Sequence, residues 1–480
     1  MSEGFLKKSK MAVLAVLVLS LIPMLLVAIY ARPLADDFGY SAGTRAVWQA
    51  SHNIFLVLGS VGAQVAKTYV DWQGSFSAIA LFALQPGLFS EKIYGLGTVV
   101  LVALFVWGNL YFFRGVFDGA GKAGDGVNGA VGKASGGPDG AAARNVAMIV
   151  AGAVLIVSMQ TLPHANQGFY WWNGASYYCL FYSLMLLQWG MIVRKKKVVL
   201  PCVLGFVLGG GNLVTGLLNL EVTALLMLVA VIEVVKGAHK TKVVVDGEIA
   251  VGGRKAPELI WLVKIAVIMV FSLAGFIVNA VAPGNAVRAS ESVSMGAVEA
   301  IGQSFIDAYQ YFGEWMNLPV VLLLLFVLPF VWFGFAGNGS GADSSEGVGV
   351  SGYGSGAGFV RRVPMFLLVL LAFGLFASTF TPTEFSMSEV GPRRIQNVRY
   401  FVFIVFMVLL ETEAVIRVRS VLKAGDSSFD TAKIGKAIAG YFMALAAGAV
   451  VFLGIYTVPK DNRNTVTSIG SSPFLCVNYL

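Results

Sequence analysis

The sequence predicts an all-α polytopic membrane protein, and its composition is the first reason. Hydrophobic residues make up 57% of the 480-residue chain, charged residues make up only 12%, and the mean hydropathy is +0.76. A soluble domain carries roughly a quarter charged residues. A chain of this length and hydropathy would leave a large apolar surface in water, whereas a bilayer solvates such a surface.

The second reason is the recurrence of apolar runs of about 20 residues, the length at which a helix crosses a bilayer. The first run follows Lys7, Lys8 and Lys10 and is longer than the apolar core of a cleaved signal peptide, so we expect it to be retained. We expect about 11 spans (10 to 13) in a single transmembrane domain over residues 1–480, namely Met11–Tyr30, Ile93–Phe113, Val146–Leu162, Tyr177–Val193, Val198–Gly216, Leu218–Val235, Leu259–Ala282, Leu318–Phe335, Val363–Phe380, Tyr400–Ile416 and Ala437–Val458.

Three further segments lie between these spans. Residues 31–92 form the first external loop, in which Phe76–Phe89 is apolar but too short to cross, so we expect interfacial or re-entrant helices there. Residues 115–144 and 336–360 are rich in glycine and poor in apolar residues, which predicts flexible cytoplasmic loops. Neither contains the GxxxxGK[ST] pattern of a phosphate-binding loop.

The basic residues indicate the orientation. With the N-terminus in the cytoplasm, clusters such as Arg194–Lys197 and Arg361-Arg362 fall on the cytoplasmic side, as the positive-inside rule requires. We therefore expect an integral protein of the bacterial cytoplasmic membrane. The net charge of +8 is then explained by topology, and because no nucleic-acid-binding motif is present, we expect no nucleic-acid partner.

This orientation places the unusual polar segments together on the external side. They are Ala35–Tyr40, Tyr69–Gly74, His164–Tyr178, Asn212–Glu221, Pro283–Arg288 and Thr381–Arg399. The orientation was chosen from the cytoplasmic clusters alone, so this coincidence is an independent indication of an external functional site.

Three carboxylates in these segments are candidates for catalysis or binding: the adjacent pair Asp36 and Asp37, and Glu221. Asp36 and Asp37 are adjacent, so they can raise each other's pKa or bind a divalent cation, and either effect suits a general base. The alternative is a solvated turn. Glu221 lies near the outer end of an apolar helix, where a carboxylate is costly unless it is paired or faces a cavity. Its alternative is an interfacial glutamate that reaches water.

Arginines and aromatic residues supply the remaining candidates. Arg393, Arg394 and Arg399 are external exceptions to the positive-inside pattern, and arginine is suited to bidentate phosphate binding. Arg288 could join them, and pairing with Glu384 and Glu389 is the alternative. The aromatic run Phe169–Gly174, with the Tyr177-Tyr178 pair and Trp72, would either stack on a sugar or headgroup or form an interfacial belt.

A first span followed by ADDFGY, then YVDWQG, YWWNGASYY and GGN with a later Glu, resembles the GT-C superfamily of membrane glycosyltransferases, and more narrowly a group of uncharacterised bacterial GT-C-like proteins. The resemblance implies many spans and an acidic motif in the first external loop. It also implies transfer of a sugar from a polyprenyl-phosphate carrier to an external acceptor. Some such relatives carry an arginine where this chain has Ser75.

The expected reaction is an inverting glycosyl transfer to a cell-envelope glycan or lipid acceptor at the external membrane surface. Asp36 or Asp37 would be the base, and the donor phosphate would be bound by Arg393, Arg394, Arg399 and Arg288. The expected substrate-binding residues are Phe38, Tyr40, Asp71, Trp72, Trp171, Trp172, Asn173, Asn212, Glu221 and Asn285.

The expected partners are the polyprenyl-phosphate-linked sugar, the acceptor and membrane lipids. The sequence specifies no cofactor, and a divalent cation (Mg²⁺ or Mn²⁺) held by Asp36 and Asp37 is compatible with the resemblance, since some GT-C enzymes use one. The alternative functions are a transporter or flippase of lipid-linked sugars, with Glu221 as a proton-coupling carboxylate, and a polymerase of such sugars.

Overall fold

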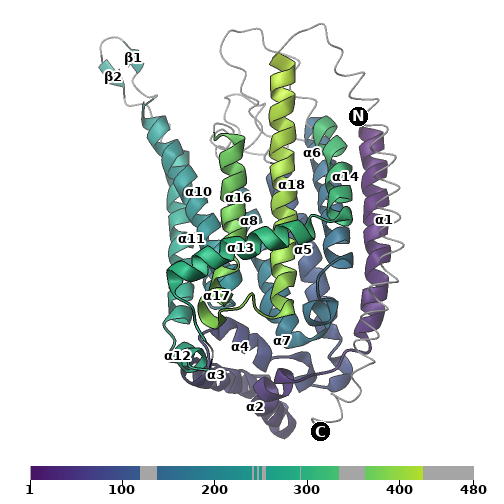
Figure 1. Cartoon of the computed structure of the whole chain (residues 1–480), viewed down its shortest axis with the longest axis vertical. Coiled ribbons are helices and arrows are strands. Elements are labelled where there is room, and N and C mark those ends of the chain that lie inside the picture. Colours follow the sequence, from purple (N-terminus) through teal and green to yellow (C-terminus); the bar gives the residue numbers. More distant parts are fainter. Residues whose placement is uncertain are drawn as a thin grey trace.

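The computed structural model describes residues 2–118, 138–239, 243–245, 248–250, 256–291, 293–334 and 363–424. Within these residues the long helices stand together as a bundle (Figure 1). They are α1 (Glu3–Ala28), α5 (Leu96–Asp118), α6 (Pro138–Gln160), α8 (Phe181–Val193), α10 (Leu213–His239), α11 (Ala256–Ala280), α14 (Leu318–Gly334), α16 (Met365–Ser378) and α18 (Arg393–Ala424).

Shorter elements connect the long helices. The shorter helices are α2 (Asp36–Ser51), α3 (Ile54–Asp71), α4 (Phe76–Ala83), η1 (Pro86–Leu88), η2 (Glu91–Ile93), η4 (Asn166–Tyr170), α7 (Trp172–Ala175), η5 (Ser176–Leu180), α9 (Val199–Gly209), α12 (Pro283–Ala289), α13 (Ala297–Trp315) and α17 (Thr381–Met387). Of these, η1 and η2 are 3₁₀-helices, and η4 and η5 are π-helices. The strands β1 (Val243–Val245) and β2 (Glu248–Ala250) pair antiparallel.

Among the described residues, seven helices are long and apolar enough to cross a membrane. The number rises to eight if α13 and α14, which meet at a bend of 76°, count as one span. The prediction of an α-helical polytopic membrane protein is therefore confirmed. The finer prediction of about 11 spans is not, and the predicted span Ala437–Val458 lies outside the described residues.

The predicted span Val198–Gly216 is not one continuous helix. Helix α9 ends at Gly209, and α10 begins at Leu213. The 11 residues of α9 extend only about 16 Å, which is roughly half the thickness of the bilayer core. The Asn212 side chain accepts the N–H of Thr215 at 2.9 Å and so caps the new helix, which is a local contact that hydropathy does not report.

Helix α18 contains the predicted span Tyr400–Ile416 and stands along the bundle (Figure 1). It is not among the seven apolar helices, and its apolar stretch includes Arg399, Glu411 and Glu413. Near the predicted loop 115–144, α5 continues to Asp118 and α6 begins at Pro138, so both ends of that segment are helical. The centre of this loop and all of 336–360 lie outside the described residues.

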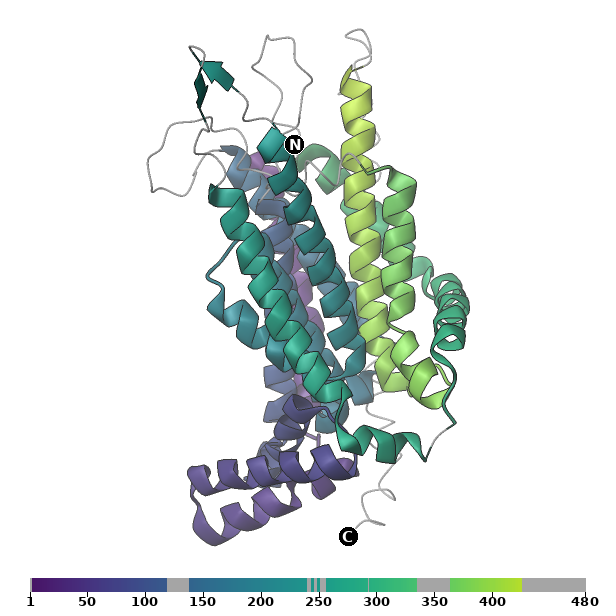
Figure 2. The same ribbon diagram turned by 90° about the vertical axis from the view of Figure 1, so that its left-hand side faces the viewer.

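The first external loop of the prediction, residues 31–92, is helical. Helices α2, α3 and α4 lie across one end of the bundle, as Figures 1 and 2 both show. Helix α12 lies at the same end, which is opposite to the start of α1 (Figure 1). We call it the α2 end.

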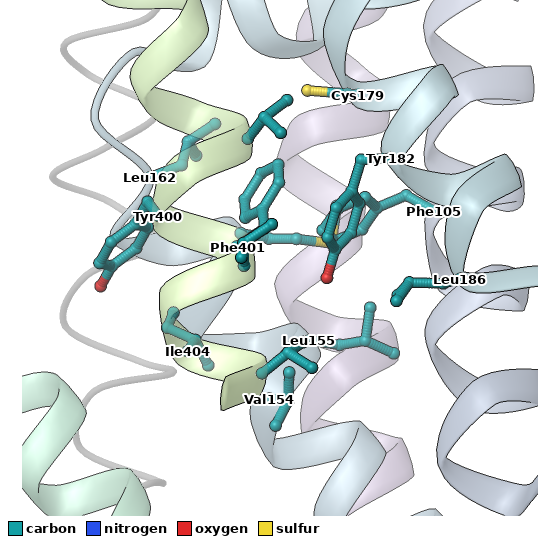
Figure 3. Packing of buried hydrophobic residues seen from close by; sticks show 14 of the residues in the cluster. Phe105, Val154, Leu155, Leu162, Cys179, Tyr182, Leu186, Tyr400, Phe401 and Ile404 are labelled. Atoms are coloured by element: carbon teal, nitrogen blue, oxygen red, sulfur yellow. The ribbon is translucent and has the colours of Figure 1, made fainter. Parts of the chain in front are cut away.

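An aromatic core joins the helices that support this end. The ring of Phe105 on α5 lies 5.5 Å from Tyr182 on α8 and 4.7 Å from Phe401 on α18 (Figure 3). Tyr182 and Phe401 are 5.2 Å apart, and the three side chains are buried. Such close packing gives little room for relative movement, so α5, α8 and α18 form a rigid frame for the α2 end.

Candidate functional site

All six polar segments that the sequence places outside the membrane are joined to described neighbours by hydrogen bonds at or near the α2 end. The bonds run between parts of the chain that are far apart in sequence: Trp171 Nε1 to Leu34 O (3.0 Å), Asn173 N to Asp37 Oδ1 (3.2 Å), Gly74 N to Asn285 Oδ1 (2.9 Å), Asn212 Nδ2 to Tyr177 O (2.5 Å) and His164 N to Asn397 Oδ1 (2.8 Å).

Asp37 is the buried member of the aspartate pair. Its side chain is 0% exposed and accepts hydrogen bonds from the Tyr94 hydroxyl (2.5 Å), from Leu34 N (3.0 Å) and from Asn173 N (3.2 Å). Burial raises the pKa of Asp37 to about 6, against the opposing effect of these donors. The carboxyl group thus ties α2 to the start of α5 and to α7, and its atoms do not face solvent.

Asp36 has the opposite environment. It is exposed and begins α2, directly after Ala35, whose backbone lies at φ 47° and ψ −117°. Successive helix positions point about 100° apart, so burying Asp37 turns Asp36 outward. The unusual backbone at Ala35 is a conformation that costs free energy and that is often found at functional sites. Of the two aspartates, Asp36 is the one that a substrate could reach.

Tyr40 connects Asp36 to the rest of the site. Burial raises the pKa of Tyr40 to about 12, and the charge of Asp36 adds to this shift. Tyr177 and Arg288 also lie within electrostatic reach of the Tyr40 hydroxyl. The ring of Tyr40 lies 5.1 Å from that of Phe82 on α4. Four segments of the chain therefore meet around one phenol.

The aromatic run is folded into two π-helical segments, η4 and η5, on either side of α7. Such wide helical turns are rare in proteins as a whole, and those that occur are often found at functional sites. The Trp172 indole donates to Leu81 O at 2.8 Å, and its backbone N–H donates to the Tyr94 hydroxyl at 2.7 Å. Asn173 is only 4% exposed, and its side-chain amide has no hydrogen-bond partner among the described residues.

Arg394 begins α18 on the side that faces this run. Its guanidinium lies 5.3 Å from the centre of the Trp171 ring and hydrogen-bonds the hydroxyl of Tyr178. Arg288 is within electrostatic reach of the same hydroxyl. The two arginines therefore approach one another across the tyrosine pair from α18 and α12.

Arg288 is held by the loop that carries Trp72. Its Nη1 donates to Gln73 Oε1 at 2.5 Å, and its guanidinium lies 5.9 Å from the Trp72 ring centre. Within the described part of the chain, neither Arg288 nor Arg394 forms a salt bridge with a carboxylate. The alternative that Arg394 is neutralised by Glu384 or Glu389 is thus not what the structure shows.

Arg399 does not fit the predicted role in phosphate binding. It is 0% exposed, and its guanidinium stacks 4.0 Å from the centre of the Phe380 ring. Its N–H groups donate to backbone carbonyls and side chains around the α17 turn, namely Thr379 O, Val390 O, Gln396 Oε1 and Thr383 Oγ1. These contacts engage the guanidinium from several directions, so Arg399 stabilises this turn.

Arg393 lies apart from the two arginines of the site. It is exposed and near His164, whose pKa is lowered first by burial and then by the charge of Arg393. The Asn397 side chain bonds both the N–H and the carbonyl of His164, each at 2.8 Å. The predicted arginine group is therefore divided, and only Arg394 and Arg288 face the aromatic run.

The loop containing Trp72 docks on α12 by backbone contact. Gly74 N donates to Asn285 Oδ1, whose Nδ2 donates to Asn279 O at 2.6 Å. A Cβ at Gly74 would overlap the carbonyl of Asn279, and one at Gly284 would overlap the loop backbone. Asn285 thus positions α12 rather than facing a ligand.

The remaining predicted residues are distributed between structural and exposed positions. Asn212 is 2% exposed and joins the start of α10 to Tyr177. Glu221 is half-buried within α10 and accepts from the Ser378 hydroxyl of α16 at 2.5 Å. Asp71 and Phe38 are exposed at the α2 end, on α3 and α2.

Two site residues were missed by sequence reasoning. Tyr94 holds both Asp37 and Trp172, yet it lies in an unremarkable stretch before α5, so no motif could have found it. Ser75 is buried, and its hydroxyl lies 3.1 Å from that of Tyr177. It was noted only as a departure from the GT-C-like pattern, but it contributes to the tyrosine pair.

Asp37 is not free to bind the divalent cation that the sequence suggests, because its Oδ1 and Oδ2 already accept N–H and O–H donors. Among the described residues there is no group of three or more His, Cys, Asp or Glu side chains placed to hold a metal ion. Asp36 is exposed, so the cation stays a prediction at that residue.

Comparisons of the chain with protein-family models, with curated proteins and with solved structures find no match.

Proposed function

We propose that this integral membrane protein is a GT-C-like glycosyltransferase that moves a sugar from a polyprenyl phosphate to a glycan or lipid acceptor on the external face of the membrane. The observation that carries the proposal is a chain of neighbours around two tyrosines. The exposed carboxylate of Asp36 and the guanidinium of Arg288 both lie within electrostatic reach of the Tyr40 hydroxyl, and Arg288 and Arg394 both lie within reach of the Tyr178 hydroxyl. Neither arginine has a carboxylate partner in the described chain. The guanidinium groups of Arg288 and Arg394 lie over the rings of Trp72 and Trp171.

In this proposal Asp36 is the catalytic base. It takes the proton of the acceptor hydroxyl while that oxygen attacks the anomeric carbon of the donor from the face opposite the phosphate. The bond between the anomeric carbon and the phosphate oxygen breaks, and its electron pair leaves with the lipid phosphate. The configuration at carbon is inverted, and the proton passes from Asp36 to water. Asp37 is a positioning residue, because its bonds fix the start of α2.

Arg288 and Arg394 supply the charge that the leaving phosphate needs. Guanidinium groups bind phosphate oxygens in a bidentate way, and a positioned cation stabilises the negative charge that develops in the transition state. Trp72 and Trp171, over which the two arginines lie, provide apolar faces for the sugar or the lipid. The buried, unpartnered amide of Asn173 adds a hydrogen-bonding group for a sugar hydroxyl.

The transporter and polymerase alternatives predict a different essential residue. A transporter would depend on Glu221, which lies on α10 and is bonded to Ser378 of α16. Among the described residues, no hydrogen bond or ion pair connects Glu221 to Asp36 or Arg394. The geometry of the α2 end therefore favours the transferase.

The test is complementation of a deletion strain, with the envelope glycans followed by mass spectrometry. We expect Asp36→Asn to lower transfer by about 10² to 10⁴ at unchanged protein level, because a general base contributes about that factor. Glu91→Gln is the matched control, since Glu91 is an exposed carboxylate at the same end that pairs with Arg45. Full restoration of the glycan by Asp36→Asn would refute the mechanism. Loss of function in Glu221→Gln alone would favour the transporter.

A further inference from the structure

A pair of carboxyl groups is buried away from Asp36 and Asp37. Asp307 on α13 is 3% exposed, and Glu384 on α17 is 2% exposed. The two side chains face one another: the hydroxyls of Ser304 and Thr381, each three residues earlier on its helix, lie 3.0 Å apart, and the two carboxyl groups interact electrostatically. Two ionised carboxylates can only accept hydrogen bonds and repel one another when buried together, so one proton shared between them is favoured.

The oxygen atoms of the pair support the same conclusion. Oδ2 of Asp307 and Oε1 of Glu384 are buried and receive no N–H or O–H donor from the described residues. The other oxygen of Asp307 accepts from Gln303 Nε2 at 2.9 Å. Leaving buried acceptors without donors is costly, and one proton held between the two side chains would supply what is missing.

The charged surroundings do not replace that proton. Arg399 is within electrostatic reach of Glu384, but its N–H groups donate elsewhere, and it forms no salt bridge with either carboxyl group among the described residues. The other titratable groups near the cluster are Tyr311 and Glu314 on α13, Glu389 after α17, and Tyr178 on η5, which reaches Arg399. Of these, Glu389 adds negative charge next to Glu384.

The geometry points to a proton-binding site shared by Asp307 and Glu384, which holds one proton and fastens α13 to α17. Helix α13 crosses α16 and α18 obliquely (Figure 1). Its other polar contact with this region is a 3.0 Å bond between the Ser304 and Thr381 hydroxyls. Loss of the proton places two negative charges together in a buried position, which weakens the attachment of α13. This inference does not depend on the glycosyltransferase proposal.

Infrared spectroscopy of the full-length protein in lipid tests the site directly. We expect the carbonyl stretch of a protonated carboxyl group at neutral pH in the wild type, and its loss in Asp307→Asn/Glu384→Gln. Glu384→Gln alone should also lose it and still fold, because glutamine keeps the shape and supplies an N–H donor to Asp307. Glu314→Gln, which removes an exposed carboxylate of α13, should retain the band. Identical spectra for the wild type and the double variant would overturn the inference.

Thermal unfolding gives a second test. Because the folded protein binds a proton that the unfolded chain releases, the melting temperature of the wild type should fall as pH rises, and this dependence should weaken in Glu384→Gln. If Mg²⁺, Mn²⁺ or Ca²⁺ instead raises the melting temperature of the wild type but not that of the double variant, the pair holds a metal ion, and the shared proton is wrong.

Discussion

Arg394 and Arg399 lie on the same helix, yet their surroundings give them different tasks. Arg394 is partly exposed beside Trp171 and Tyr178, whereas Arg399 is enclosed and bonded to the turn after α16. An arginine with free N–H groups at the mouth of a site can bind an anion. An arginine whose donors are engaged by backbone carbonyls and neighbouring side chains, as those of Arg399 are, stabilises the local fold.

Replacing each arginine with alanine should therefore affect a different property: stability for Arg399 and donor binding for Arg394. We expect Arg399→Ala to lower the melting temperature, because each buried carbonyl left without a donor costs about 1–3 kcal/mol. Arg394→Ala should melt like the wild type but require at least about tenfold more lipid-phosphate donor for half-maximal transfer. The measurements are the melting temperature of each variant and its rate of transfer as a function of donor concentration. If Arg399→Ala melted like the wild type but bound the donor more weakly, Arg399 would be a phosphate-binding residue after all.

Asp37 predicts a pH dependence of stability. Burial raises its pKa from 3.8 to about 6, so the folded protein holds the proton more tightly than the unfolded chain does. The resulting contribution to stability is present at acidic pH and is lost as pH rises through about 6. It amounts to about 3 kcal/mol at most.

The measurement is the melting temperature from about pH 4 to about pH 7. The wild type should lose stability over this range, and Asp37→Asn should lose less, because it has no charge to bury. Asp71→Asn, which alters an exposed carboxylate at the same end, is the control and should follow the wild type. An unchanged pH profile in Asp37→Asn would show that Asp37 is not the titrating group.

At the scale of elements, α12 and the Trp72–Gly74 loop behave as one unit. Glycine is required where they touch, because backbone atoms occupy the space that a side chain would need. This contact carries Arg288 toward the tyrosine pair, so the position of α12 sets one half of the proposed phosphate site.

Gly74→Ala tests that unit. The added methyl group would overlap the carbonyl of Asn279, so we expect a loss of about 1–3 kcal/mol in stability together with weaker donor binding. Gly62→Ala lies within α3, where no atom approaches the new Cβ, and it should be neutral or stabilising by up to about 1 kcal/mol. If Gly74→Ala and Gly62→Ala had equal melting temperatures and bound the donor equally well, the close contact between the Trp72–Gly74 loop and α12 would not be needed for stability or binding.

At the scale of the whole molecule, the long helices stand side by side, and α2, α3 and α12 lie at one end of the bundle (Figures 1 and 2). The polar segments are joined to one another at or near this end. The distribution of basic residues, such as Lys196 between α8 and α9, predicts that the N-terminus of the chain lies in the cytoplasm and that the α2 end faces outward. A polyprenyl-phosphate donor on the external surface requires the α2 end to face outward.

Cysteine labelling measures this orientation. In a background without Cys179, Cys202 and Cys476, Asn53→Cys in the exposed turn between α2 and α3 should react with a membrane-impermeant reagent in intact cells. Lys196→Cys should react only after permeabilisation, since basic clusters remain in the cytoplasm. The reverse pattern would place the α2 end in the cytoplasm and exclude an external transferase.

The sequence by itself determined the membrane-embedded helical class and the grouping of polar segments that meet at the α2 end. Hydropathy and charge are sums over neighbouring residues, so they can be read without a structure. Only the tertiary structure decided that Asp37 is buried and Asp36 is exposed, that Arg399 holds a turn, and that α9 stops short of a span. Burial and hydrogen bonding depend on distant partners, as in the bond between Asp37 and Asn173, 136 positions apart, and no local pattern encodes such a contact.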